Sequence, residues 1–171
     1  TVLARAGREV HVFDRAVFPR DKCCGDGLTT LALRELEALG FDPSAVASWQ
    51  PVDDVVIRSP FGTERRYPLP NGVGYHAAVA RREDLDAALV DLLRQAGADL
   101  HEGTSLTEAS AAGDAVDLRF GDAEYRARFV IAADGMWSPT RKLLGLAVEG
   151  YRGEWHAFRQ YFRNVSPRAA Q

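Results

Sequence analysis

The stretch that decides the fold runs from residue 10 to residue 29 and reads VHVFDRAVFPRDKCCGDGLT. Its first four residues are typical of a short buried strand in a parallel sheet, and Asp14 follows directly after them. Asp14 is therefore expected at the carboxyl edge of the sheet, where open α/β sheets bind ligands. A carboxylate there can accept hydrogen bonds from both hydroxyls of a ribose. The stretch predicts an α/β fold with a nucleotide site.

The phosphate-binding part of such a site is missing from the sequence. A dinucleotide fold needs G-x-G-x-x-G between its first strand and first helix, about 20 residues before the acidic residue. Residues 1–7, TVLARAG, are instead typical of the last turns of that helix, with Gly7 as a left-handed C-cap. The chain has no initiator Met, no charged and apolar leader and no membrane-spanning apolar run. We therefore expect an interior fragment of a soluble protein.

Composition indicates an ordinary globular chain. Its 171 residues are 46% hydrophobic and 26% charged, so a core can form and disorder is not expected. This length would suit about one domain, but the missing strand and glycine loop favour parts of two. The net charge of −3, with acidic and basic residues interspersed, gives no electrostatic reason to expect a nucleic-acid partner.

The cysteines and histidines argue against structural cross-links and metal sites. Cys23 and Cys24 are adjacent, so they form neither a long-range disulfide pair nor a C-x-x-C motif, and a reducing, cytoplasmic compartment is expected. The four histidines are scattered without the spacing of metal ligands, and we expect no metal site. They are His11, His76, His101 and His156.

Periodicity predicts two helices and several short strands. Leucines at helical spacing predict helices over 28–39 and 82–96, which end at Gly40 and Gly97. Alternating or β-branched runs between turn residues predict the strands. These are 55–58, 64–69 and 75–79 in an antiparallel sheet, 98–101 as a returning strand, 104–109, 115–120 and 124–128 in a meander, 129–133 as a second buried strand, and one that opens at Tyr161.

Three blocks of the sequence resemble a known family. FDRAVFPRDKCCGDGLT, ARREDLDAALVDLLRQAGA and FVIAADGMWSPTRKLLGL occur in the order and spacing seen in geranylgeranyl reductase-like flavoproteins of the p-hydroxybenzoate hydroxylase superfamily. The resemblance covers nearly the whole chain and implies FAD as cofactor. It implies a partial FAD-binding Rossmann-like domain, residues 1–48 and 81–150, interleaved with part of an antiparallel β-sheet substrate domain, residues 49–80 and 151–171.

The resemblance also implies roles for individual residues around FAD. Asp14 matches the acid on the adenosine ribose, and Arg15 matches a position against the adenine end. Arg82, in an R-x-x-L-D pattern, matches an Arg that reaches the phosphate and ribityl region. Asp134 and Gly135 match the Asp-Gly motif near the pyrophosphate, and Ser138 and Arg141 follow in that motif.

The segment from Arg20 to Gly27 resembles the stretch that runs toward the flavin ring and borders the substrate cavity. Its candidate cofactor-binding residues are Arg20, Lys22, Cys24, Gly25 and Gly27. The two glycines would let the backbone approach a planar ring and adopt dihedral angles closed to other residues. Cys24 takes the place of the family's Cys and is expected to line the cavity, with a catalytic role as the alternative; Cys23 replaces the usual Pro.

Purely structural readings stand beside these roles. Asp14 can end a strand in a turn, and Asp134-Gly135 is a common turn dipeptide. Arg82 can form an ion pair with Asp86, four residues later on the same helix. A Cys such as Cys24 is often a small apolar residue of the core.

The resemblance implies an FAD-dependent oxidoreductase that transfers a hydride to a carbon–carbon double bond of an isoprenoid, such as a geranylgeranyl lipid or the menaquinone side chain. The alternatives are a monooxygenase or halogenase on the same scaffold, because cofactor motifs do not fix the reaction, and a non-catalytic dinucleotide-binding fragment. The expected partner is an isoprenoid or quinone lipid, with peripheral contact at the cytoplasmic face of a membrane. The sequence indicates neither an electron donor nor a proton donor. Without the glycine loop, we expect the chain alone to bind FAD weakly or not at all.

Overall fold

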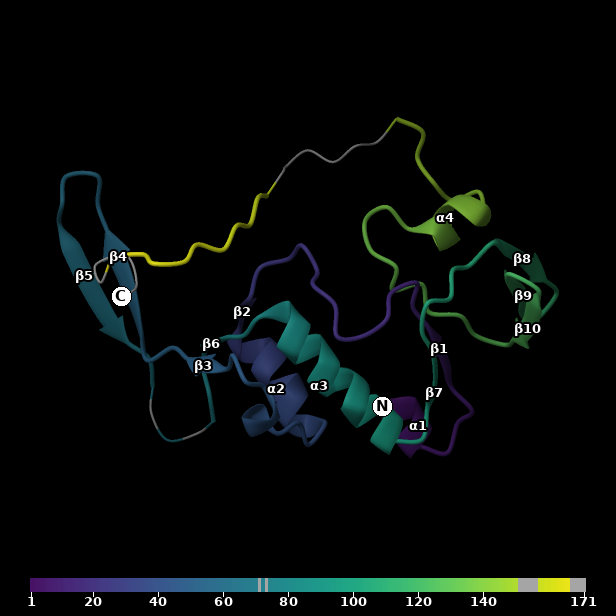
Figure 1. Ribbon diagram of the computed structural model, residues 1–171, viewed down its shortest axis with the longest axis horizontal. Helices are drawn as coiled ribbons and strands as arrows, with labels where there is room; N and C mark the ends of the chain where they lie inside the picture. Colours follow the sequence, from purple (N-terminus) through teal and green to yellow (C-terminus); the bar gives the residue numbers. More distant parts are fainter. Residues whose placement is uncertain (71, 73, 151–156, 167–171) are drawn as a thin grey trace. The chain divides into compact units, whose positions relative to one another are not determined.

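The computed structural model describes residues 1–70, 72, 74–150 and 157–166 (Figure 1). The chain divides into two compact units. The first unit comprises Thr1–Arg20 and Asp86–Arg152, and the second comprises Asp21–Leu85 and Gly153–Gln171. The predicted division into a cofactor domain and a substrate domain follows other boundaries and stays a prediction; its part over 151–156 and 167–171 lies outside the described residues.

The first unit contains a pair of parallel strands. Strand β1 (His11–Phe13) pairs with β7 (Asp99–His101), and Phe13 lies opposite His101. Helix α1 (Val2–Arg5) precedes β1, and Gly7 has a φ of 72°, as predicted for a helix end. Strand β1 is partly exposed rather than buried, and in the described part of the chain it pairs with β7 alone.

Helix α3 (Arg82–Gln95) connects toward β7 and is the longest described helix. Its sequence explains its bounds. Glu83 and Asp84 in the first turn complement the helix dipole, and Gly97 follows its end with a φ of 81°. The predicted helix over 82–96 is thus confirmed to within one residue.

An antiparallel meander completes the first unit. Strands β8 (Glu108–Ala112), β9 (Ala115–Phe120) and β10 (Ala123–Ala127) lie in the order β10, β9, β8. Gly113 and Gly121 take positive φ in the tight turns between them. The prediction for β9 was correct, and that for β10 was one residue late, but β8 begins at Glu108 rather than at residue 104.

The predicted strand over 129–133 is wrong. The structure assigns no strand to these residues, and Phe129 and Ile131 are 86% and 77% exposed. Within the described residues, β1 and β7 form a sheet of two strands that pair only with each other. An apolar run forms a buried strand only where its backbone pairs with a neighbouring strand, and residues 129–133 pair with none of the described strands.

The described residues of the second unit form helix α2, a short 3₁₀ turn, two small sheets and the first turn of α3. Helix α2 buries Leu33, and Gly40 follows it with a φ of 69°. The elements are β2 (Gly27–Leu28), α2 (Thr30–Ala38), η1 (Pro43–Ala45), β3 (Gln50–Pro51), β4 (Asp54–Arg58), β5 (Glu64–Pro68) and β6 (Ala78–Val79). Both sheets are antiparallel, as predicted, but the predicted strands do not share one sheet: β6 pairs with β2 and β3, whereas β4 and β5 form a separate hairpin.

Three details of this unit differ from the prediction. Leu28 belongs to strand β2 rather than to the helix, because its backbone pairs with Ala78. The strand expected over 75–79 is limited to Ala78–Val79. Tyr161 lies in an irregular segment and opens no strand; its hydroxyl contacts Arg159 and Asp26.

Candidate functional site

Asp14 lies where the sequence predicts it, at the carboxyl end of β1. Its backbone N–H donates to the carbonyl of His101 at 3.1 Å, and its carbonyl accepts from Thr104 at 2.9 Å. Both ends of the residue are therefore fixed to the chain that leaves β7. The side chain is 31% exposed, and its Oδ1 accepts the N–H of Ala16 at 2.9 Å. A carboxylate has about four acceptor positions, so capacity remains for a ligand.

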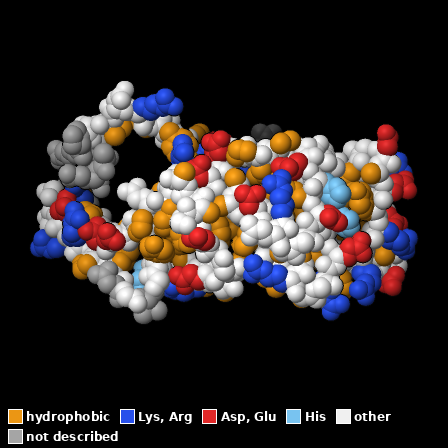
Figure 2. Space-filling view, turned by 60° about the horizontal axis from the view of Figure 1, so that its bottom comes forward, with side chains coloured by type: hydrophobic (Ala, Val, Ile, Leu, Met, Phe, Trp, Pro, Cys, Tyr) orange, Lys and Arg blue, Asp and Glu red, His pale blue; other side chains and the backbone are white. Residues whose placement is uncertain are grey.

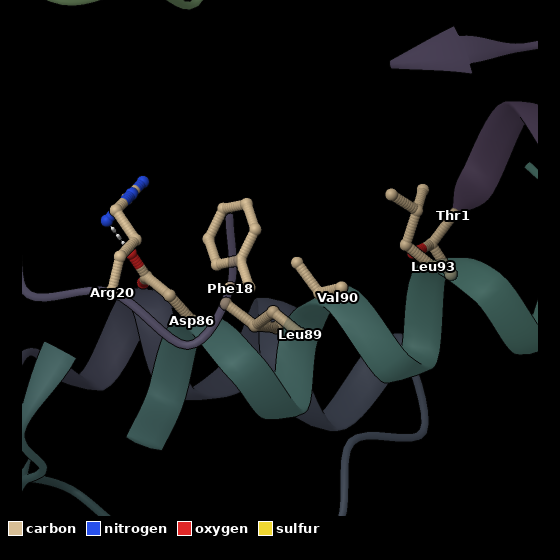
Figure 3. A pocket seen from close by; sticks show the side chains of 7 residues that line it. All are labelled: Thr1, Phe18, Arg20, Asp86, Leu89, Val90 and Leu93. Carbon is tan, nitrogen blue, oxygen red and sulfur yellow. Dashed lines mark hydrogen bonds and ion pairs between the residues drawn. The ribbon is translucent and has the colours of Figure 1, made fainter. Parts of the chain in front are cut away.

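Arg20 lies between two carboxylates, and we call this group the Arg20 bridge (Asp14, Arg20 and Asp86). Nη1 of Arg20 donates to Oδ2 of Asp86 at 2.8 Å, as Figure 3 shows. Nη2 lies 3.6 Å from Oδ2 of Asp14, which is an ion-pair distance rather than a hydrogen bond. Asp86 is the most enclosed member, with its side chain 9% exposed.

An open pocket of about 290 Å³ adjoins the Arg20 bridge. Figure 3 shows Arg20 and Asp86 at one end and Leu93 at the other, with α3 as one wall. The guanidinium of Arg20 lies over the ring of Phe18, 4.8 Å from its centroid. The lining residues are Thr1, Phe18, Arg20, Asp86, Leu89, Val90 and Leu93. The pocket is apolar along α3 and charged at one end.

Asp134 lies in a tight turn that leads into helix α4 (Pro139–Leu143). Its Oδ2 accepts the N–H of Thr140 at 2.9 Å, and Gly135 takes a φ of 83°. Desolvation acts to raise the pKa of Asp134, but hydrogen bonds from Ser138 and Thr140 outweigh it and hold the pKa below its ordinary value. Asp134 is therefore ionised and engaged with the start of α4, which fits the structural reading; its expected place near a pyrophosphate stays a prediction.

The segment expected to face a flavin is largely exposed in this chain. Lys22, Cys23 and Cys24 are exposed, and both thiols are free. The expectation for Gly25 and Gly27 is wrong in one respect, because neither glycine has a φ in the left-handed region. A Cβ added at either glycine would meet nothing within 4 Å, so no protein atom requires a glycine there. A close approach to a ring system remains a prediction.

Two further arginines were predicted to contact the cofactor, and they lie on different elements. Arg15 is exposed on the loop after Asp14, and Arg82 is the first residue of α3 and half-buried. Asp86, the residue expected to pair with Arg82, forms an ion pair with Arg20 at 2.8 Å, which the sequence spacing did not indicate.

Sequence analysis also missed a polar network in the second unit, which we call the Arg159 network (Asp21, Asp26, Arg159 and Tyr161). Arg159 donates to both carboxylate oxygens of Asp21 at 2.7 Å and to Asp26 at 3.1 Å. The hydroxyl of Tyr161 donates to Oδ2 of Asp26 at 2.7 Å. The two aspartates lie more than 130 positions before Arg159 and Tyr161 in the sequence, so opposite charge alone did not indicate that they pair.

Hydrogen bonding changes the pKa values of two members of the Arg159 network. The hydrogen bond to Asp26 raises the pKa of the Tyr161 hydroxyl, and desolvation acts in the same direction. Hydrogen bonding to Asp21 raises the pKa of Arg159, against desolvation. Both groups therefore hold their protons more tightly than usual, and the network ties the 157–166 segment to the loop that contains Cys23 and Cys24.

Charge and metal-ligand chemistry add few constraints. On the face drawn in Figure 2, acidic and basic side chains lie interspersed. Among the described residues, no group of three His, Cys, Asp or Glu side chains is arranged to hold a metal ion. No helix in the described ranges has the length and apolar character needed to cross a bilayer. His156 lies outside the described residues.

Comparison with known proteins gives a consistent result. The family model described as "FAD binding domain" matches residues 1–170. A menaquinone reductase of Mycolicibacterium smegmatis is 36% identical over 98% of this chain, which covers 41% of the relative. The chain thus spans about two fifths of the length of this relative.

Solved structures agree on the fold. A flavoprotein/dehydrogenase from Cytophaga hutchinsonii matches with a TM-score of 0.70 and 21% identity, over 84% of this chain and 38% of the other. The flavin-dependent halogenase CmlS matches with a TM-score of 0.68 and 26% identity, over 84% of this chain and 28% of the other. The predicted α/β fold is therefore confirmed.

Proposed function

The chain belongs to the FAD binding domain family, and from this premise we propose that it is part of an FAD-dependent oxidoreductase that reduces carbon–carbon double bonds of an isoprenoid chain. The proposed substrate is a quinone or related lipid with an isoprenoid side chain. Its support is the 36% identity to a menaquinone reductase over nearly the whole chain. Because the chain covers only part of that relative, the activity is proposed for the full-length protein.

The single observation that carries the cofactor assignment is the position of Asp14. A family of FAD-binding proteins needs an acceptor for the adenosine ribose at the end of a parallel strand. Asp14 lies at the end of β1, is fixed by two backbone hydrogen bonds and keeps acceptor capacity on a partly exposed carboxylate. These properties fit the ribose of FAD.

The residues of this chain would divide the work around the cofactor. Asp14 would orient the ribose, Arg15 would lie along the adenine end, and Arg82 would offset phosphate charge from the start of α3. FAD, when bound and reduced, supplies the hydride. The segment from Lys22 to Gly27 would border the substrate. One carbon of the double bond gains the hydride and its neighbour gains a proton, so each reduced bond takes up H₂.

A monooxygenase or a halogenase remains the second candidate. The observation that favours it is the 26% identity to the halogenase CmlS. A shared scaffold and cofactor do not decide what the reduced flavin does next, so the reaction has to be measured.

The cofactor assignment is tested on the full-length protein. Purified wild type should carry the yellow absorption of bound flavin. Asp14→Ala should lose most of it, because the ribose acceptor is gone. Asp117→Ala is the matched control: its carboxylate forms an exposed ion pair with Arg126 on the meander, and it should stay yellow. Equal flavin content in wild type and Asp14→Ala contradicts the role of Asp14, and a colourless wild type that gains no flavin from added FAD contradicts the whole proposal.

The reaction is tested with chemically reduced enzyme, without oxygen, and a menaquinone with an unsaturated side chain. Mass spectrometry should show the mass of H₂ added per reduced side-chain bond. An unreduced side chain under these conditions, together with a hydroxylated or halogenated product of an aromatic substrate under oxygen, would establish the second candidate instead.

A further inference from the structure

We propose that Arg20 is a positioning residue that acts on FAD through Asp14, with Asp86 as its anchor. This inference rests on the proposed function, because it assigns Asp14 to the ribose of FAD. It changes the expected role of Arg20 from a direct cofactor contact to the support of another residue. The carrying observation is the Arg20 bridge.

The first step of the argument is the closed form of the loop from Asp14 to Arg20. Oδ1 of Asp14 accepts the N–H of Ala16, and the Ala16 carbonyl accepts the N–H of Gly103 at 3.0 Å. The N–H of Phe18 donates to Glu102 at 2.7 Å, so the loop is tied to the end of β7 at several points. The side chain of Arg20 then returns to Asp14, which closes the loop on itself.

The second step is the anchor of Arg20 on α3. Asp86 is 9% exposed, and a carboxylate with so little contact with water needs a cationic partner. Arg20 supplies that partner at 2.8 Å while its ring contact with Phe18 fixes the guanidinium plane. A planar guanidinium has five donors in a fixed arrangement, so holding one edge on Asp86 also fixes the edge that faces Asp14.

The third step is the choice between a direct and an indirect role. The guanidinium of Arg20 already faces the carboxylates of Asp14 and Asp86, so its charge is largely offset and it is poorly suited to bind a phosphate directly. The separation of 3.6 Å from Asp14 leaves the carboxylate without a direct hydrogen bond from Arg20. Asp14 therefore gains a fixed position and charge balance and still keeps acceptor positions for a ribose.

The experiment is a double-mutant cycle on FAD affinity in the full-length apoprotein. Arg20→Gln should weaken FAD binding by roughly tenfold, which corresponds to about 1.4 kcal/mol. Asp14→Asn should weaken it further, and Arg20→Gln should add little in the Asp14→Asn background, because the two residues act on the same ribose. Arg20→Lys should recover part of the loss.

Controls separate positioning from general damage. Arg126→Gln removes an exposed ion pair of the same unit and should leave FAD affinity unchanged. Arg20→Gln removes the ion pair that Arg20 forms with the enclosed Asp86, so Arg20→Gln with Asp86→Asn repeats the measurement with that carboxylate charge removed as well. It should bind FAD as weakly as Arg20→Gln alone.

The outcomes distinguish this inference from the proposed function. A wild type that binds FAD, with Arg20→Gln equally tight, overturns the inference and leaves the function intact. Equal penalties for Arg20→Gln in the wild-type and Asp14→Asn backgrounds also overturn it, because Arg20 would then act independently of Asp14. A wild type without FAD affinity overturns both.

Discussion

The carboxylate of Asp134 accepts the backbone N–H of Thr140, with 2.9 Å between Oδ2 and N. Ser138 accepts the N–H of Arg141 at 3.0 Å in the same turn. The first N–H groups of a helix have no partner within the helix, and these two side chains satisfy two of them. The start of α4 therefore depends on side chains of the Asp-Gly turn that precedes it.

Asp134→Asn should loosen α4 in a pH-dependent way. Desolvation raises the pKa of Asp134, but the hydrogen bonds from Ser138 and Thr140 lower it more, so the folded pKa lies below the ordinary value of about 3.9. A carboxylate whose pKa is lowered by folding stabilises the folded state at pH values above its unfolded pKa. This stabilisation is lost as the pH falls through the folded pKa. Hydrogen exchange of residues 134–146, corrected for intrinsic rates, should be faster in the variant near neutral pH. The difference from wild type should vanish in strong acid; equal protection near neutral pH would refute the role of the carboxylate.

Tyr161 should titrate later than an ordinary tyrosine. Its hydrogen bond to Asp26 is the main cause of the raised pKa, and desolvation adds to it. For this group the folded pKa exceeds the unfolded value of about 10, so its stabilising effect is present below that pH and is lost as pH rises through the folded pKa. Ultraviolet titration of the full-length protein follows the tyrosines, and Tyr161→Phe identifies the signal of Tyr161. The pKa of Tyr161 should be lower in Asp26→Asn than in wild type. Tyr67→Phe is the control: this exposed tyrosine lies on β5, and its removal should leave the titration of Tyr161 unchanged. An unchanged Tyr161 titration in Asp26→Asn would show that Asp26 does not hold the proton.

The sequence predicted those features of the fold that depend on residues close together in the chain. Helix α3, strand β1 and the place of Asp14 after it follow from neighbouring residues and were predicted correctly, although β1 is partly exposed rather than buried. The apolar run over 129–133 failed as a predicted strand because a strand needs a neighbour in a sheet, which local pattern does not reveal.

The candidate site follows the same division. Asp14 was identified from its place after a strand, whereas its link to Arg20 and Asp86 depends on a loop that folds back onto α3. The Arg159 network joins residues at opposite ends of the chain and has no periodic signature. Long-range pairing of charges is set by the fold, so a single sequence does not specify it.

Phe120→Ala should destabilise the first unit. The ring of Phe120 is 9% exposed and stacks on Phe13 of β1, with centroids 3.9 Å apart and planes at 11°, so it joins the meander to the parallel pair. Removal of a buried aromatic ring costs about 3 kcal/mol or more. Thermal unfolding of the full-length protein should start at a lower temperature, and FAD should be released earlier. Val148→Ala, at a residue that is 75% exposed, should change neither quantity, and equal unfolding of the two variants would contradict the packing role of Phe120.

Gly25→Ala separates a requirement of the fold from a requirement of the cofactor. A Cβ at Gly25 meets no atom within 4 Å and its φ lies outside the left-handed region, so the substitution should leave thermal unfolding of the apoprotein unchanged. Gly97→Ala is the contrasting variant, because Gly97 ends α3 with a φ of 81° and an Ala there costs about 1 kcal/mol. If the backbone at Gly25 approaches the flavin ring, Gly25→Ala should weaken FAD binding. Gly97→Ala should instead lower the temperature of thermal unfolding. If the FAD affinity of Gly25→Ala equals that of wild type, the added Cβ meets no flavin ring, and the prediction that this segment approaches the flavin is wrong.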